Sequence, residues 1–206
     1  MRVSPSRIAP LTCVVIVFGV TQACSQEKWA PPPIPGQSIH APATVTEEFV
    51  KGLQVGPARI VLEHTPLDAV QHRLRAGPIG RAGEAASFME WLCLRGGNGP
   101  DGWVLWLESG EMSAGTVDRF HLVSAPAVGS VDRRCRHLPP TMTVDIPKHL
   151  ALGLPDSVVR GLVGPPSAVV GDTLIYWYLR DVQNTLFLVI ERGRVAQIAV
   201  WRSSAL

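Results

Sequence analysis

The second half of the chain has the clearest alternation of hydrophobic and polar positions. Pro155 opens an expected helix, in which Val158 and Leu162 lie four positions apart on one hydrophobic face. Gly164 and the two prolines after it end this helix. Segments rich in β-branched and aromatic residues, joined by short polar turns, then predict antiparallel strands at 173–180, 185–191 and 195–202.

The first half of the folded region has the same order of elements, a helix followed by three strands. Thr65 and Pro66 are expected as the N-cap and first position of a helix, and Val70 and Leu74 share its hydrophobic face. Gly77 and the proline after it end the helix, and the glycine-rich stretch 96–102 can only be a loop. The strands predicted in this half are 88–94, 103–108 and 117–123.

The two halves also correspond position by position. Asp68, Val70 and Leu74 recur 88 positions later as Asp156, Val158 and Leu162, and the offset changes only at loops. The alternative is two generic units that share turn residues by chance. We therefore expect an α+β fold of two tandem units, 46–140 and 141–206, each a helix or helical hairpin packed on a small antiparallel sheet.

Residues 145–202 resemble a known family. The helix with its Gly-Pro-Pro end (153–166), the Tyr176-Trp177-Tyr178 strand and the segments 186–191 and 195–198 are similar to the BamE/SmpA/OmlA outer-membrane lipoproteins. The resemblance implies a small lipoprotein of the β-barrel assembly machinery. BamE is a single unit, and a doubled unit resembles the β-lactamase-inhibitor protein. No binding residue of the family can be matched to this chain.

The N-terminus predicts export. Arg2 and Arg7 precede an apolar run of 13 residues at 8–20, which is shorter than the roughly 20 residues of a membrane-spanning helix. A signal peptide over 1–23 is expected, and an uncleaved anchor is the alternative. Ala23 and Cys24 resemble a lipobox, which implies lipidation of Cys24 and, with Ser25 after it, an outer-membrane location on the periplasmic side.

The lipobox resemblance leaves the anchoring open. Residues 21 and 22, Thr and Gln, depart from the lipobox, and ordinary cleavage after residue 23 would give a soluble periplasmic protein with the same start.

The proline-rich stretch 24–45 cannot join a helix or a sheet interior, so we expect an extended tether there.

Charge and cysteine content narrow the function. Without the signal peptide, 17 basic residues balance 17 acidic ones, and the absence of a basic face excludes a nucleic-acid-binding protein. Cys93 and Cys135 form an even pair in an oxidising compartment, which predicts a disulfide. A metal site that includes His137 is the alternative, although no second ligand pair accompanies it. We expect no cofactor and no metal.

No catalytic motif emerges, and the chain is expected not to be an enzyme. Glu108 and Glu191 occupy matching positions that favour a role in turns, and a titrating carboxylate or histidine in a cleft would reopen an enzymatic interpretation.

The predicted strands carry more tryptophan and tyrosine than a core of this size needs, and such residues are favoured at binding sites. The candidate partner-binding set is Trp103, Trp106, Tyr176, Trp177 and Tyr178.

Strand parity and composition lead to a functional expectation. Trp103 and Trp106 should point to opposite sheet faces, as should Trp177 and its two tyrosine neighbours. Aromatic side chains would then either line an exposed face or be buried between the units. The sequence predicts an envelope lipoprotein that binds an envelope protein as an assembly or scaffold factor, with a periplasmic inhibitor of a hydrolase as the alternative.

Overall fold

A computed structural model describes residues 29–34, 36–37, 45–84, 87–113, 115–128 and 131–204. The expected signal peptide (1–23) and Cys24 lie outside these residues. The helices are α1 (Leu67–Leu74), α2 (Ala125–Val128) and α3 (Asp156–Val163), with short 3-10 helices at Gly99–Asp101, Glu111–Ser113 and Pro147–His149. The strands are β1 (Gly52–Val55), β2 (Ala58–Val61), β3 (Gly80–Glu84), β4 (Ser87–Gly96), β5 (Trp103–Gly110), β6 (Arg119–Ser124), β7 (Arg136–His137), β8 (Val144–Asp145), β9 (Ala168–Val170), β10 (Thr173–Leu179), β11 (Gln183–Glu191) and β12 (Arg194–Ser203).

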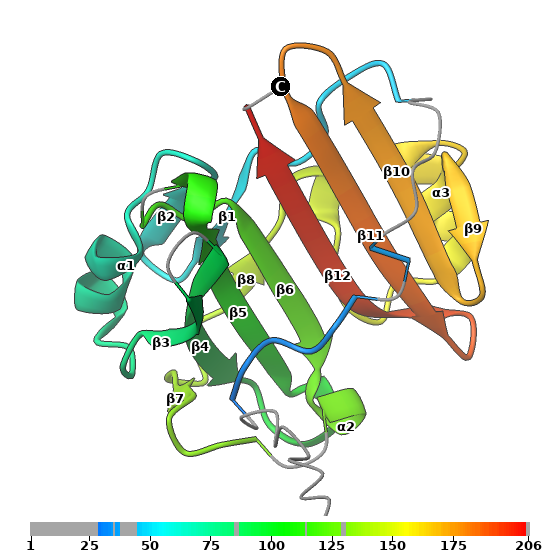
Figure 1. Cartoon of the computed structure of the whole chain (residues 1–206). Helices are drawn as coiled ribbons and strands as arrows, with labels where there is room; N and C mark the ends of the chain where they lie inside the picture. The colour runs from blue at the N-terminus through cyan, green and yellow to red at the C-terminus, as the bar shows by residue number, and fades with distance from the viewer. Residues whose placement is uncertain are drawn as a thin grey trace, which may run out of the picture.

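One long sheet runs through both halves of the chain. Its order is β3-β4-β5-β6-β12-β11-β10-β9, with antiparallel neighbours throughout, and β7 pairs parallel with β4. A second sheet has the order β2-β1-β8. The two halves meet where β6 pairs with β12, from Gln197 opposite Val123 to Trp201 opposite Arg119 (Figure 1).

The expected fold class is therefore wrong. Strands make up 46% of the chain and helices 17%, and the strands do not form two small sheets that each carry a helix. A helix followed by four strands does occur in each half, as α1 with β3–β6 and α3 with β9–β12. The free edges of these strand groups pair with each other, because an unpaired edge would leave a row of backbone donors and acceptors without partners.

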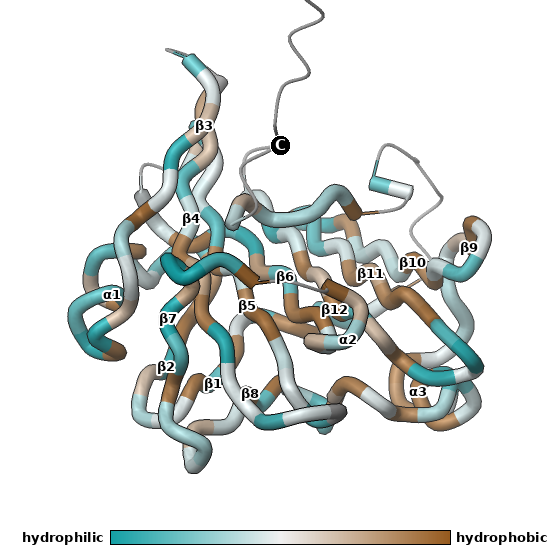
Figure 2. Tube along the Cα trace, turned by 90° about the horizontal axis from the view of Figure 1, so that it is seen from below, coloured by the Kyte–Doolittle hydropathy of each residue, from teal (hydrophilic) through white to brown (hydrophobic). Residues whose placement is uncertain are grey.

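A single hydrophobic core lies on one face of the long sheet. It joins side chains of β4, β5, β6, β10, β11 and β12 to the small sheet, α1 and α3. Hydrophobic positions recur along the central strands of both halves (Figure 2). The two halves therefore share one core.

The helices differ from the sequence prediction in detail. Val70 and Leu74 of α1 are buried as expected, but Val158 and Leu162 of α3 are 43% and 38% exposed, and Val159 points into the core instead. Val159 and Val163 form a second stripe at the same four-residue spacing, so the pattern alone did not fix which stripe is buried.

The start of α1 also differs. The helix begins at Leu67 with Pro66 as its N-cap residue, and no side chain caps it. Thr65 Oγ1 instead accepts a hydrogen bond from the Val61 amide at 2.8 Å, so this threonine tightens the turn after β2.

A half-buried ionic network ties the segment before β1 to β12. Arg202 donates to Glu48 at 2.6 Å and is also paired with Glu63. Burial alone would raise the pKa of Glu48, but hydrogen bonds from Arg202, Asn184 and Lys51 outweigh it and lower this pKa. The network fixes residues 45–50 against the last strand.

The second face of the long sheet carries a smaller apolar cluster, against which Val128 of α2 and Val131 pack. Residues 29–34, 36 and 37, which we call the N-terminal strap, cross it without joining the sheet (Figure 1). We call this surface the strap face.

Candidate functional site

Trp29 fixes the first end of the strap. Its side chain is 5% exposed, and its ring meets the ring of Trp91 edge-on with 5.3 Å between centroids. The Trp106 indole N–H donates to the Trp29 carbonyl at 2.9 Å, and the Arg134 guanidinium lies 4.4 Å from the centre of the Trp29 ring. This part of the expected tether therefore packs on the sheet, although it is extended as the prolines require.

The strap prolines cross the middle of the sheet above His121. Burial lowers the pKa of His121 to about 4, and hydrogen bonds with Gln197 and the Pro32 backbone act in the opposite direction. The ring Nε2 lies 3.0 Å from Gln197 Oε1. His121 is therefore neutral near pH 7 and supports the strap as an uncharged side chain.

Ile34 fixes the far end of the strap. It packs against a cluster of Ile175, Phe187 and Ala199, from β10, β11 and β12. Gly36 follows with a φ of +79°, and a Cβ at this position would lie 3.1 Å from Ile175 Cδ1. The strap thus extends from β4 to β10.

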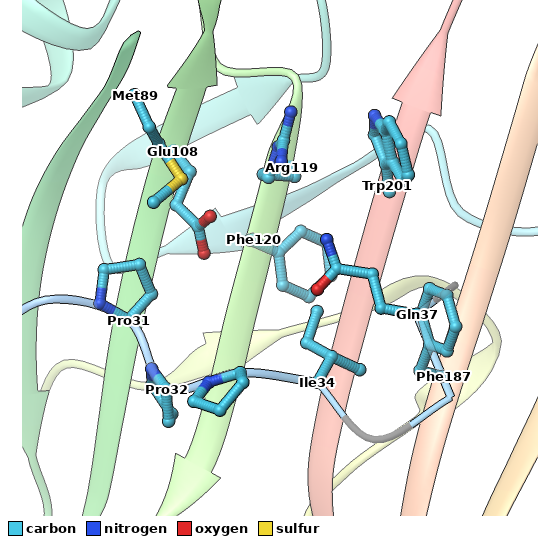
Figure 3. A pocket seen from close by; sticks show the side chains of 11 residues that line it. Pro31, Pro32, Ile34, Gln37, Met89, Glu108, Arg119, Phe120, Phe187 and Trp201 are labelled. Atoms are coloured by element: carbon cyan, nitrogen blue, oxygen red, sulfur yellow. The ribbon is translucent and has the colours of Figure 1, made fainter. Parts of the chain in front are cut away.

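A cavity of about 140 Å³ lies between the strap and the sheet. In Figure 3 the Glu108 carboxyl and the Gln37 side-chain amide point into it from opposite sides. The cavity is lined by Pro31, Pro32, Pro33, Ile34, Gln37, Met89, Glu108, Arg119, Phe120, Phe187 and Trp201.

Glu108 is the most perturbed carboxyl at this site. The residue is 5% exposed, and burial raises its pKa to about 7, while Arg119 acts to lower the pKa and Asp118 to raise it. Its carboxyl makes no hydrogen bond or ion pair within the part of the chain that the structure describes. Such a group in a cavity marks a candidate functional site.

Arg119 and Asp118 form an ion pair beside the cavity. Arg119 Nε lies 3.0 Å from Asp118 Oδ1, and the guanidinium lies 5.0 Å from the centre of the Trp201 ring. Asp118 also accepts hydrogen bonds from the Gly110 amide at 3.1 Å and from Ser113 Oγ at 2.5 Å. The pair is fixed, so the positive charge of Arg119 is largely neutralised.

A second, open groove of about 530 Å³ adjoins the cavity. The two share Met89, Arg119 and Trp201 in their walls, and the groove continues past Phe88 and Met112. Met112 is 78% exposed. Together, the cavity and the groove connect the buried Glu108 carboxyl to solvent.

Glu108 and Arg119 are the ionisable side chains among the described residues that line the cavity. Glu108 is the kind of titrating carboxylate that would reopen an enzymatic interpretation. General-base catalysis requires a reacting group within hydrogen-bonding distance, and nucleophilic catalysis an activated side chain. The residues lining the cavity include no Ser, Thr, Cys, Lys or His.

The predicted partner-binding residues do not form one surface. Trp103 and Tyr176 lie in the main core, and Tyr178 packs against it from a half-buried position. Trp106 lies on the strap face, 1% exposed beneath Trp29, and Trp177 is 9% exposed. The expected opposite orientation of Trp103 and Trp106 is confirmed, since they belong to different clusters.

Sequence reasoning missed the residues that line the cavity. Glu108 was expected at the end of the strand 103–108 with a role in the following turn, but β5 continues to Gly110, and Glu108 shares the face of Val104 and Trp106. The alternation along 104, 106 and 108 was the available signal.

The predicted disulfide is confirmed by its geometry. Cys93 and Cys135 are bonded with 4.5 Å between their Cα atoms, and both belong to the cluster under Trp29. The alternative metal site has no support, since no group of three His, Cys, Asp or Glu that could hold a metal occurs in the described ranges.

Among the helices that the structure describes, none is both long and apolar enough to cross a bilayer.

Compared with known proteins, the chain has no significant match to a family model, a curated protein or a solved structure. The BamE-type resemblance of residues 145–202 stays a prediction, so function has to be inferred from the geometry of the chain itself.

Proposed function

We propose that this protein is an exported, non-enzymatic binding protein that receives a protein partner on its strap face. The proposal rests on one observation, the segment of the chain that covers this face. An aromatic and apolar sheet surface that includes Trp91, Trp106 and Phe187 is covered by a proline-rich segment without regular secondary structure.

The strap indicates what kind of contact the face accepts. Proline-rich extended segments commonly bind to aromatic-lined grooves, because their backbone is already ordered before binding. In this protein the segment belongs to the same chain and is fixed by one buried tryptophan, a row of prolines and one isoleucine. A partner with similar chemistry would displace the strap and use the same surface.

The width of the face favours a protein over a small molecule as the main partner. Eight strands lie side by side in the main path of the sheet, and at a spacing of about 4.8 Å they extend over roughly 34 Å. A standard protein interface buries about 800 Å² on each side. A patch of that size fits within the strap face once the strap has moved away.

The location in the proposal comes from the N-terminal sequence. The expected signal peptide and the lipobox-like Cys24 favour anchoring at the periplasmic side of the outer membrane, which would place the partner in the envelope. The partner-binding surface shifts from the aromatic set predicted from sequence to the strap face, which includes Trp106 of that set.

Photo-cross-linking from defined positions tests the proposal. A benzophenone amino acid at Met112 or Trp201 should give one discrete protein adduct in intact envelopes, since both residues line the groove of the strap face. The matched controls are Val158 and Leu162, exposed apolar positions on the outer side of α3. Adducts formed only from α3, or from neither surface, would contradict the proposal.

The same experiment separates the second candidate, a periplasmic inhibitor of a hydrolase. The width of the strap face favours a folded partner, which suits both candidates. Mass spectrometry of the adduct distinguishes them, because an inhibitor yields one soluble hydrolase and a scaffold factor yields assembly or cell-wall components.

A further inference from the structure

The cavity under the strap has features of a second, smaller binding site. Its volume of about 140 Å³ is close to that of cavities that hold a benzene molecule. A ligand of about six non-hydrogen atoms therefore fits without displacing the strap. The strap supplies one wall and the sheet the other, so this site does not depend on the protein partner proposed above.

The Glu108 carboxyl defines the chemistry of the ligand. It is 5% exposed, points into the cavity and has no hydrogen-bonding or ion-pairing partner among the described residues (Figure 3). Buried carboxylates are stable when a cation or several N–H groups satisfy them. The cavity thus lacks the one group that Glu108 needs.

The surrounding charges favour a ligand with a single positive charge. When Glu108 is ionised, Glu108 and Asp118 carry two negative charges beside the one positive charge of Arg119. Arg119 Nε and Nη2 already donate to Asp118, at 3.0 and 3.4 Å. The described strap residues add no charge, and His121 next to them is neutral near pH 7.

The remaining walls suit a short hydrocarbon chain. Phe187, Met89 and Ile34 give apolar contacts, and Gln37 offers a side-chain amide on the side opposite the carboxyl. Aromatic rings such as those of Phe187 and Trp201 also attract cations. We propose that this cavity binds a primary ammonium group on a short alkyl chain, with the nitrogen donating to Glu108 and the chain extending toward Trp201.

Two sources could supply this group: a free alkylamine, or the side chain of a lysine on another protein. Both have the same ammonium and a similar four-carbon chain. A free amine can enter the cavity directly, whereas a lysine has to reach it through the open groove beside Met89 and Arg119.

The test is an NMR titration of the full folded chain with n-butylamine near pH 8.5. The side-chain amide of Gln37 and the indole N–H of Trp201 should shift in a saturable manner, while the indole of Trp103 on the opposite face should not. N-acetyl-lysine amide is the second probe. Saturable binding of either one supports the site and identifies its source.

Two controls separate ion pairing from nonspecific apolar binding. Glu108→Gln keeps the size of the side chain and should weaken butylamine binding about ten- to hundredfold, whereas Glu191→Gln, at an exposed strand end, should leave it unchanged. Wild-type binding should also be about tenfold weaker near pH 6 than near pH 8.5, since burial raises the pKa of Glu108 to about 7.

The proposal would be overturned by equal binding of n-butanol and n-butylamine, by undiminished binding to Glu108→Gln, or by no binding of either amine probe. None of these outcomes bears on the partner proposed for the wide face, which photo-cross-linking tests separately.

Discussion

Replacing Glu108 with glutamine should stabilise the protein at neutral and alkaline pH. Burial raises the pKa of Glu108 from 4.5 to about 7, a difference of about 2.5 units. At about 1.4 kcal/mol per unit, the folded protein is less stable by about 3 kcal/mol once this carboxyl is ionised in both states.

The sign of the pH dependence follows from proton binding. Between about pH 4.5 and pH 7 the unfolded chain has released the Glu108 proton and the folded chain has kept it, so stability falls as the pH rises through this window. Glutamine carries no charge at any pH. The free energy of unfolding of Glu108→Gln relative to wild type should therefore increase by about 3 kcal/mol from about pH 4.5 to about pH 8.

Urea denaturation at a series of pH values measures this difference. Other titrating groups, His121 among them, are present in both proteins and cancel in the comparison. Glu191→Gln is the matched control, because Glu191 is exposed at the end of β11 and its variant should give a difference independent of pH. A constant offset between Glu108→Gln and wild type at every pH would refute the reasoning, since it would mean that the carboxyl titrates normally in the folded chain.

Three further changes probe the strap, the disulfide and the ionic network. Trp29→Ala removes the side chain packed against Trp91, so limited proteolysis should cut within residues 29–37 much faster, with a loss of about 3 kcal/mol in strap docking; equal cleavage of both proteins would contradict the packing. Replacing Cys93 and Cys135 by serine should lower the free energy of unfolding by about 3 kcal/mol in urea, and an unchanged midpoint would argue against the bond. Arg202→Met leaves Glu48 and Glu63 without their shared partner, so thermal unfolding should show a loss of about 3 kcal/mol or more, while the exposed Arg180→Met should cost little.

The sequence located the six longest strands well. The predicted strand at 103–108 corresponds to β5, and the one at 195–202 to β12, because alternating hydrophobic positions extend along each of them. The strands that pattern analysis missed, such as β7, β8 and β9, have two or three residues, too few to show a period.

The joining of the halves could not be predicted from the same signals. Strand alternation shows which residues share a face, but it does not show that β6 pairs with β12, more than seventy positions away in the sequence. Each half has the expected order of a helix and then strands, so the error lay in treating the free edges as the borders of two units.

The candidate site was missed for a related reason. The prolines of residues 31–33 correctly exclude helix and sheet, but nothing in their pattern shows that this segment covers a sheet face. Without that cover, Glu108 reads as the last residue of a strand, beside a turn. Its burial and altered pKa arise only when the strap, β5 and β6 come together.

The central claim is that the strap and the partner share one sheet face, and a disulfide lock tests it most directly. A Cβ built on Gly36 would lie 3.7 Å from Val170 Cβ, within the range that a disulfide spans, so Gly36→Cys with Val170→Cys should bond the strap to β9, at the cost of the strain that a side chain meets at a φ of +79°. The native Cys93–Cys135 bond is buried and should survive mild reduction. We expect partner adducts from Trp201 to disappear in the locked protein and to return when the lock is reduced. Equal adduct yields before and after reduction would contradict the claim.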